Sequence, residues 1–377
     1  MALYVGLMSG TSIDGIDAVL ADITKSSSTI VDSYSVDFSD ELKELLHSLC
    51  TGTDNELEKA GVACVKLADA EGEAVNGLLK KANVDKREVV AVGSHGQTVR
   101  HSPEKSFSIQ LDDGARLAAL TGIDVVNNFR AADIANGGQG APLTQAFHRH
   151  FFAKDNEVSM VLNLGGIANL TVIDKDAKHS IIQAFDTGPA NTLIDTAMRL
   201  LLKQPFDKDG QIAASGKVIP ELLAKYLDAP YLKEPPPKST GRETFNVDFI
   251  AEELLICTQD PDFIKDFIAT LTEFTVLCSV NAIRQCLFKQ KIDRATLTVC
   301  GGGAYNKVMM SRFKKLLEPN HVEVHTAEDT GISSKLIEAH AFAYFAYLYM
   351  NNTALDLGQS TGARQNSILG CLHKSVR

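Results

Sequence analysis

Short apolar stretches separated by small polar turns fill the first part of the chain and predict β-strands. One longer segment instead carries apolar residues at a spacing that fits one face of a helix, among them Leu57, Ala60, Val65 and Val75. The predicted order is β-β-β-α-β-α-β, with the elements at 2–8, 15–23, 29–37, 54–83, 89–93, 112–121 and 123–126.

The second half of the chain shows a similar order of predicted elements. Strands come first, a helix with Pro189 in its first turn follows, and strands and helices then alternate. We expect strands at 158–163, 167–173, 180–185, 295–300 and 322–325, and helices at 189–202, 304–317 and 333–350. A chain of 377 residues is too long for a single core. The repetition therefore predicts an α/β protein of two similar domains, at 1–130 plus 355–377 and at 131–354.

Each half contains a Gly-rich turn between two predicted strands, at residues 4–20 and 161–173. Such a turn presents backbone N–H groups and little side-chain bulk, so it can hold phosphate groups. One such turn is an ordinary hairpin, but two in corresponding positions predict that both halves grip one polyphosphate. The tips at Gly10-Thr11-Ser12 and Gly165-Gly166 would donate to the phosphates, and Asn169 would add an amide contact. The alternative is that these glycines only make tight turns.

A third Gly-rich element, Gly301-Gly302-Gly303, follows a predicted strand and precedes a helix. Three glycines are more than such a turn needs, and they would let an adenosine lie against the backbone. Two other candidate nucleotide loops fail on spacing, at 210–218 and 137–140. The Pro-rich stretch 234–243 is a stiff loop, which is either a ligand-contacting loop or a plain connector.

The net charge of −10 disfavours nucleic acid or an anionic membrane as a partner, but it permits a nucleotide held with Mg²⁺. The seven cysteines contain no Cys-x-x-Cys pair and indicate reduced, mostly buried thiols in a cytosolic protein. The N-terminus lacks signal-peptide features, and no apolar run approaches the ~18 residues of a membrane span. We therefore expect a cytoplasmic protein.

The glycine-rich elements resemble those of the superfamily that contains actin, hexokinase and the seventy-kilodalton heat-shock chaperone. More specific strings look like the anhydro-N-acetylmuramic acid kinase family, from Gly6 to about Gly362. These strings are GLMSGTSIDGID at 6–17, SHGQTVRH at 94–101, NFRAADIA at 128–135, GQGAPL at 138–143 and FDTGP at 185–189. The resemblance implies two similar domains of the actin/hexokinase-like, ribonuclease H-like type around a central cleft.

The resemblance also implies an activity. The enzyme would use ATP and Mg²⁺ to open the 1,6-anhydro bridge of 1,6-anhydro-N-acetylmuramic acid and to phosphorylate O6, in peptidoglycan recycling. Asp186 would be the general base, because it matches the family's catalytic aspartate. The substrate residues would be His95, Gln97, Arg130 and Glu338. The nucleotide residues would be Gly10, Thr11, Ser12, Ile13, Asp14, Gly15, Ile16, Asp17, Gly165, Gly166, Asn169, Gly301, Gly302 and Gly303.

Two positions depart from the expected patterns. Leu7 stands where the superfamily usually has an Asp, so no metal ligand is assigned, and Asp14 and Asp17 are only nearby candidates. Ala190 stands where the family is expected to have Gly. The resemblance leaves a homodimer possible.

Other readings remain open at this stage. An ordinary sugar kinase acting on a free hydroxyl would use the same fold and a similar carboxylate. An ATPase module for a protein partner would need a further peptide-binding domain, which a chain of 377 residues does not provide. Single residues also have plain alternatives: Asp186 as a turn or cap residue, Arg130 paired with Asp133, and Glu338 as a solvated helix residue.

Overall fold

The structure is a computed structural model that describes residues 2–10, 13–25, 27–154, 157–174, 181–236, 238–241, 244–331 and 333–376. The chain forms two compact units, Met1–Phe151 with Leu336–Arg377, and Phe152–Lys335. These differ from the boundaries expected from the sequence, because 131–151 and 336–354 belong to the first unit. The physical reason is that the helix at 337–350 packs on strands of the first unit.

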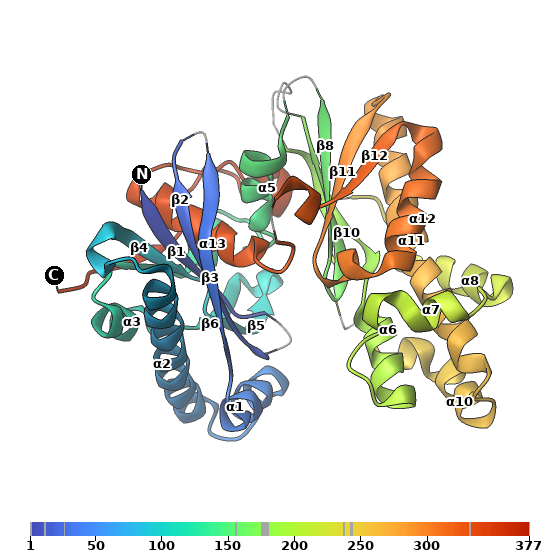
Figure 1. Ribbon diagram of the computed structural model, residues 1–377, viewed down its shortest axis with the longest axis horizontal. Helices are drawn as coiled ribbons and strands as arrows, with labels where there is room; N and C mark the ends of the chain where they lie inside the picture. The colour runs from blue at the N-terminus through green and yellow to red at the C-terminus, as the bar shows by residue number, and fades with distance from the viewer. Residues whose placement is uncertain are drawn as a thin grey trace. The chain divides into compact units, whose positions relative to one another are not determined.

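The first unit contains a six-stranded sheet in the order β13-β7-β4-β1-β2-β3. Its elements, coloured blue to teal and red in Figure 1, are β1 (Leu3–Met8), β2 (Gly15–Ile23), β3 (Ser28–Asp37), α1 (Asp40–Thr51), α2 (Glu56–Ala82), β4 (Val89–Ser94), β5 (Gln97–Ser102), β6 (Phe107–Leu111), α3 (Gly114–Thr121), β7 (Val125–Asn127), α4 (Phe129–Ala135), α5 (Thr144–Phe152), α13 (Ile337–Met350), α14 (Gly358–Thr361) and β13 (Cys371–His373). Apolar side chains of β1 and β2 form a core with α1, α2 and α3. Helix α13 also contacts β1, β2 and β4.

The second unit contains a five-stranded sheet in the order β10-β9-β8-β11-β12. Its elements, green to orange in Figure 1, are β8 (Val158–Leu164), β9 (Ile167–Ile173), β10 (Ile181–Pro189), α6 (Thr192–Ala197), α7 (Gln211–Ser215), α8 (Pro220–Leu227), α9 (Pro230–Lys233), α10 (Ala251–Gln259), α11 (Phe263–Gln290), β11 (Ala295–Cys300), α12 (Lys307–Leu317) and β12 (Val322–Thr326). The long helix α11 packs on β9 and β10, and α12 packs on β12.

The two sheets share one topology, which confirms the duplication predicted from the order of elements. In each sheet, the first three strands pair antiparallel in chain order. A fourth strand then pairs parallel with the first strand, and a fifth pairs parallel with the fourth. The first sheet gains only β13, which pairs antiparallel with β7. The fold is therefore α/β with two mixed sheets, as the sequence predicts.

Several helices begin where a polar side chain accepts a hydrogen bond from an otherwise unsatisfied backbone N–H. Ser39 accepts from the N–H of Leu42 at the start of α1, and Asp113 accepts from that of Arg116 at the start of α3. Asn306 accepts from two N–H groups at the start of α12. This cap explains why α12 begins at Lys307, after a 3₁₀ turn at Gly302–Tyr305, rather than at the expected residue 304.

The helix predicted at 189–202 starts too early. Pro189 pairs with Ile167 as the last residue of β10, and α6 begins at Thr192. Strand β10 lies at the edge of its sheet, where a proline without an N–H is tolerated. No element was predicted at α1, α4, α14, β13 or the β5–β6 hairpin, nor at the five helices from α7 to α11. The predicted start of α13 lies four residues too early.

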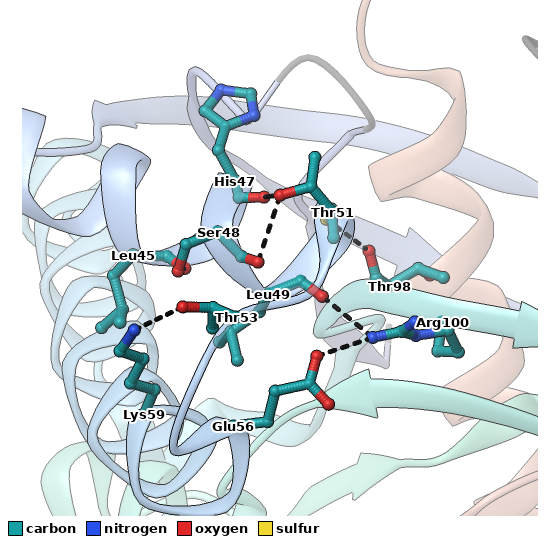
Figure 2. A network of polar contacts seen from close by, with 11 residues as sticks. Leu45, His47, Ser48, Leu49, Thr51, Thr53, Glu56, Lys59, Thr98 and Arg100 are labelled. Atoms are coloured by element: carbon teal, nitrogen blue, oxygen red, sulfur yellow. Dashed lines mark hydrogen bonds and ion pairs between the residues drawn. The ribbon is translucent and has the colours of Figure 1, made fainter.

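The β5–β6 hairpin is tied to the connection between α1 and α2, as Figure 2 shows. Arg100 on β5 donates from Nη2 to the Leu49 carbonyl at 3.3 Å and to Glu56 Oε1 at 2.9 Å. Lys59 on α2 donates to Thr53 Oγ1 in the same connection. These contacts hold the strand that begins at Gln97, one of the predicted substrate residues.

The cysteines agree with the expectation of reduced, mostly buried thiols. In the described part of the chain none of the seven forms a disulfide, and Cys257, Cys278, Cys286 and Cys300 are buried. Among the described residues, no helix has the length and apolar character needed to cross a bilayer.

Helix α13 approaches the first sheet so closely that only glycine fits beneath it. A Cβ on Gly93 would lie 2.1 Å from the Phe342 carbonyl oxygen, and one on Gly6 would lie 1.9 Å from the Ala339 carbonyl oxygen. The two glycines are neighbours in the parallel pair of β1 and β4. The backbone of α13 therefore rests directly on the backbone of the sheet.

We expect Gly93→Ala to destabilise the protein by about 1–3 kcal/mol, because the added methyl forces α13 away from the sheet. Urea unfolding followed by circular dichroism measures this change. Gly61→Ala is the matched control, since nothing lies within 4 Å of a Cβ at Gly61 on α2. The control should be neutral or more stable by up to about 1 kcal/mol. Equal unfolding midpoints for Gly93→Ala and the wild type would contradict the close contact.

Candidate functional site

The turn between β1 and β2 carries the first group of predicted nucleotide residues. Thr11 and Ser12 lie outside the described residues. Ile13 and Ile16 point into the core of the first unit, and Gly15 packs against the Val36 carbonyl. The side chains of Ile13 and Ile16 therefore shape the turn from inside the core. Any contact of Ile13, Gly15 or Ile16 with a ligand is through the backbone. Gly10 accepts a hydrogen bond from the N–H of Ile13, and Asp14 is exposed.

Ser9, at the start of this turn, is joined to the second predicted motif. Its hydroxyl donates to Gln97 Oε1 at 2.5 Å, and both side chains are buried. Gln97 Nε2 in turn donates to the Thr98 carbonyl. The Gln97 side chain thus ties the β1–β2 turn to the start of β5. Sequence reasoning did not single out Ser9, although it stands inside the motif at 6–17.

His95 and Arg130, from motifs 35 residues apart, meet directly. Arg130 Nη2 lies 2.9 Å from His95 Nε2. A guanidinium can only donate, so Nε2 must be the acceptor and the ring proton must sit on Nδ1. Burial, with the Arg130 charge adding to it, lowers the pKa of His95 to about 3. His95 is therefore a neutral ring at physiological pH, and its Nδ1 is buried with no partner among the described residues.

The remaining contacts of Arg130 exclude the predicted alternative of a pair with Asp133. Arg130 Nη1 donates to the Gly140 carbonyl at 2.9 Å, and its buried Nε has no described partner. Asp133 instead accepts from the Gly140 N–H and from the Thr361 hydroxyl. Burial lowers the pKa of Arg130 to about 10, so the side chain stays charged at neutral pH.

Glu338, in the first turn of α13, lies within electrostatic reach of Arg130 and Asp17. Burial raises the pKa of Glu338, the Arg130 charge lowers it, and the Asp17 charge raises it further. Glu338 is thus not the solvated residue of the plain alternative. Asp17 accepts a hydrogen bond from Ser35 at 2.5 Å. His95, Arg130, Glu338 and Asp17 form one polar cluster, which we call the first-unit cluster.

The turn between β8 and β9 contains Gly165 and Gly166. Their carbonyl oxygens accept hydrogen bonds from the N–H groups of Ala190, Asn191 and Thr192, just before and at the start of α6. Among the described residues, nothing accepts from the N–H of Gly165 or Gly166. The turn therefore keeps its N–H groups available while its carbonyls are fixed, which suits an anion.

Asp186 lies within β10 at a bulge, three residues before the strand ends, rather than at the strand end expected from the sequence. Both of its carboxylate oxygens are held. Asn169 Nδ2 donates to Oδ1 at 2.8 Å, and the Thr240 N–H donates to Oδ2 at 2.9 Å. Asn169 was predicted to contact phosphate, but here its amide orients the carboxylate.

The Pro-rich loop positions Asp186. The Asp186 N–H donates to the Lys238 carbonyl at 3.1 Å, and the Tyr231 hydroxyl donates to the Asp186 carbonyl at 2.8 Å. Backbone and side chain of Asp186 are thus both held by residues 45 to 54 positions later in the chain. No motif in the sequence pointed to Tyr231 or Thr240, since their contacts arise from folding alone.

The three glycines after β11 differ in what they do. A Cβ on Gly301 or Gly303 would collide with Leu164 of β8, so these two permit packing. Gly302 lines a cavity of about 410 Å³, together with Ile194, Asp195, Phe206 and Tyr305. Burial raises the pKa of Asp195 to about 6. The cavity has the mixed apolar and polar lining that suits a nucleoside.

The described residues hold no group of three or more His, Cys, Asp or Glu that would bind a metal by itself. Mg²⁺ commonly keeps several waters and binds through substrate phosphates with one or two carboxylates. The residues present are therefore compatible with Mg²⁺ carried by a nucleotide, and they offer no separate protein cage for it.

A family model and two sequence relatives point to one family. The model of the family "Anhydro-N-acetylmuramic acid kinase" matches residues 2–375. The protein of that name from Shewanella loihica is 41% identical over 373 residues, covering 98% of each chain. The one from Coxiella burnetii (strain Dugway 5J108-111) is 41% identical over 372 residues, covering 98% of this chain and 97% of its own. A solved structure, the activator of 2-hydroxyisocaproyl-CoA dehydratase from Clostridium difficile with bound ADPNP, aligns over 93% of this chain and 96% of its own, with 11% identity and a TM-score of 0.48.

We expect the His95 ring to stay neutral, with its proton on Nδ1, between pH 5 and pH 8, because its pKa is about 3 and Arg130 occupies Nε2. Nitrogen NMR of ¹⁵N-histidine protein measures both properties, and His95→Gln identifies the signal. Arg130→Met should let the proton distribute over both nitrogens. A proton on Nε2, or a titration between pH 5 and pH 8 in the wild type, would contradict this arrangement.

Proposed function

The chain belongs to the anhydro-N-acetylmuramic acid kinase family, and we propose that it uses ATP to convert 1,6-anhydro-N-acetylmuramic acid to N-acetylmuramic acid 6-phosphate in peptidoglycan recycling. The observation that carries the residue roles is the fixed carboxylate of Asp186. Asn169 Nδ2 donates to one of its oxygens and the Thr240 N–H donates to the other, so the carboxylate is held in one orientation. Such a carboxylate can take a proton from an aligned water molecule.

The proposed reaction opens the internal bridge and transfers phosphate together. The water oxygen bonds to C1 while the C1–O6 bond breaks, and the water proton passes to Asp186. O6 bonds to the γ-phosphorus as the bond between that phosphorus and ADP breaks. The carbon centre passes through an oxocarbenium-like state, as in glycoside hydrolysis, and phosphoryl transfer depends mainly on positioning and charge neutralisation.

The first-unit cluster supplies the proposed sugar site. Arg130 binds the lactyl carboxylate, since it remains charged and its Nε–H has no described partner. His95 offers a neutral Nδ1–H as a donor to the sugar. Gln97 holds the turn that carries His95, and Glu338 contacts the sugar near C1.

ATP is proposed to bind through backbone groups and the cavity at Gly302. In the second unit, the N–H groups of Gly165 and Gly166 contact the phosphates. The adenosine lies in the cavity between Ile194, Phe206 and Tyr305. Mg²⁺ carried by the nucleotide would neutralise part of the phosphate charge. Asp14, in the β1–β2 turn, and Asp17, on β2, are the candidate carboxylates for it in the first unit.

The bridge-opening step is tested with ¹⁸O-labelled water, ATP and the anhydro sugar. We expect one ¹⁸O atom at C1 of the phosphorylated product, because water replaces O6 at that carbon. The reaction is quenched early, and authentic product incubated in labelled water corrects for spontaneous exchange at C1. A product that carries no label above this correction, or equal turnover of N-acetylmuramic acid without the bridge, would favour an ordinary sugar kinase.

Asp186→Asn should lower kcat by about 10²–10⁴-fold, because the amide cannot accept the water proton. Sugar binding, measured by calorimetry, and the unfolding temperature should stay near the wild-type values. Asp293→Asn, at an exposed position of the same unit, is the matched control and should keep full turnover. Turnover of Asp186→Asn within a few-fold of the wild type would show that Asp186 is structural.

A further inference from the structure

Two buried carboxyl groups lie behind the turn that carries His95 and Gln97, and the proposed reaction uses neither. Glu71 lies on α2 and is 2% exposed. Asp112 follows β6, and both of its carboxylate oxygens are buried. Burying a carboxylate without compensation is costly, so a buried pair needs a physical reason.

Glu71 holds the turn through a relay of two hydrogen bonds. The Ser94 hydroxyl donates to Glu71 Oε1 at 2.7 Å, and the Gly96 N–H donates to the Ser94 hydroxyl at 3.1 Å. The bonded N–H of Gly96 lies directly between His95 and Gln97 in the chain. Glu71 therefore fixes the backbone that presents both side chains.

Asp112 packs directly against the same turn. Gly96 has a φ of +67°, and a Cβ there would lie 2.4 Å from the Leu111 carbonyl oxygen and 3.3 Å from Asp112 Oδ2. Gln97 also pairs with Leu111 across the β5–β6 hairpin. The turn thus has no free space on the side where the two carboxyl groups lie.

The two groups titrate together. Burial raises the pKa of Glu71 well above its usual range, and the Asp112 charge adds to this rise. Burial also raises the pKa of Asp112 to about 7, against the opposing effect of Asn127 and Ser94. Two neighbouring buried carboxyl groups cannot both ionise cheaply, so their protons leave in separate steps.

The surroundings add negative rather than positive charge. Asp113 raises the pKa of both carboxyl groups, and the thiol of Cys64 on α2 faces them. His373 bonds to Asn127 on the far side, and Arg116 is paired with Asp69. Among the described residues, no Lys or Arg forms an ion pair with Glu71 or Asp112.

We propose that Glu71, through the Ser94 relay, and Asp112, through its contact with Gly96, are positioning residues that hold the Ser94–Gln97 turn in the shape that binds the sugar. This inference rests on the proposed function of His95 and Gln97. Once both groups are ionised, two negative charges repel behind the turn and loosen the Ser94 relay. Affinity for the sugar should then fall, while ATP, proposed to bind mainly in the second unit, should be unaffected.

The first test compares KM values at pH 6.5. Glu71→Ala and Ser94→Ala should each raise the KM for the anhydro sugar about tenfold, because each breaks the relay. Their KM for ATP should not change. Glu71→Gln keeps an acceptor for Ser94 and should restore a near-normal sugar KM. Glu73→Gln, two residues along α2 and exposed, is the matched control. If Glu71→Ala does not fold, the smaller change Ser94→Ala decides the result.

The second test follows pH. The sugar KM of the wild type should stay level near pH 7, where Asp112 loses its proton, and should rise at the higher pH where Glu71 loses the last proton of the pair. Asp112→Asn leaves at most one charge behind the turn and should remove this rise. Carbon NMR of ¹³C-carboxyl-labelled protein should show one carboxyl that titrates near pH 7 and is absent in Asp112→Asn. This readout needs no substrate.

The outcomes separate the two proposals. A wild type that does not phosphorylate the anhydro sugar refutes the proposed function, while the carboxyl titration still tests the pair. An active wild type whose sugar KM is unchanged in both Glu71→Ala and Ser94→Ala overturns the inference. Absence of a carboxyl that titrates near pH 7 overturns it as well.

Discussion

The direct contact between the backbone of α13 and the strands β1 and β4 is the constraint on which the first unit depends. Gly6 and Gly93 permit this contact, because no side chain separates helix and sheet there. Residues of the same stretch of α13 also line the polar cluster. Phe342 contacts Gly93 through its carbonyl, and its ring lies 4.8 Å from the His95 ring and 5.5 Å from the Phe129 ring. Glu338, one turn earlier in α13, faces Arg130. The contact that packs α13 on the sheet therefore also sets the geometry of the polar cluster.

In this cluster, the positions of the hydrogens decide which polar groups donate hydrogen bonds and which accept them. Arg130 has only donors, so it fixes which nitrogen of His95 is protonated. Its other bond, to the Gly140 carbonyl, depends on the loop that Asp133 and Thr361 hold. A neutral ring beside a buried cation can offer one donor and no negative charge. That combination suits the recognition of an anionic sugar better than acid–base chemistry at His95.

The second unit uses the same strand order for a different purpose. Its edge strand β10 carries Asp186, and a bulge and a long loop from elsewhere in the chain hold the carboxylate. Asn169, on the neighbouring strand, stands opposite Asp186 in the ladder and donates to it. Duplication of the fold thus left two sheets of one topology with unlike polar groups. The first unit gathers cation and imidazole, whereas the second presents an oriented carboxylate and, at Gly165 and Gly166, a turn whose carbonyl oxygens are fixed.

Local pattern in the sequence was sufficient for the second sheet, for every strand of the first sheet except β13, for α2 and for the duplication, because period and turn residues act over a few positions. The resemblance of their motifs to those of a known family also made Asp186, His95 and Arg130 candidates, and their roles stay predictions. Local pattern failed where distant contacts decide. Pro189 ends an edge strand rather than starting a helix. Two of the three glycines after β11 pack against Leu164. The side-chain amide of Asn169 donates to the Asp186 carboxylate. Glu71, Tyr231 and Thr240 could not be found from local pattern, because their partners lie 23 to 54 residues away. Only the tertiary structure brings such groups within hydrogen-bond distance, and hydrogen bonds depend on distance and direction, which sequence spacing does not encode.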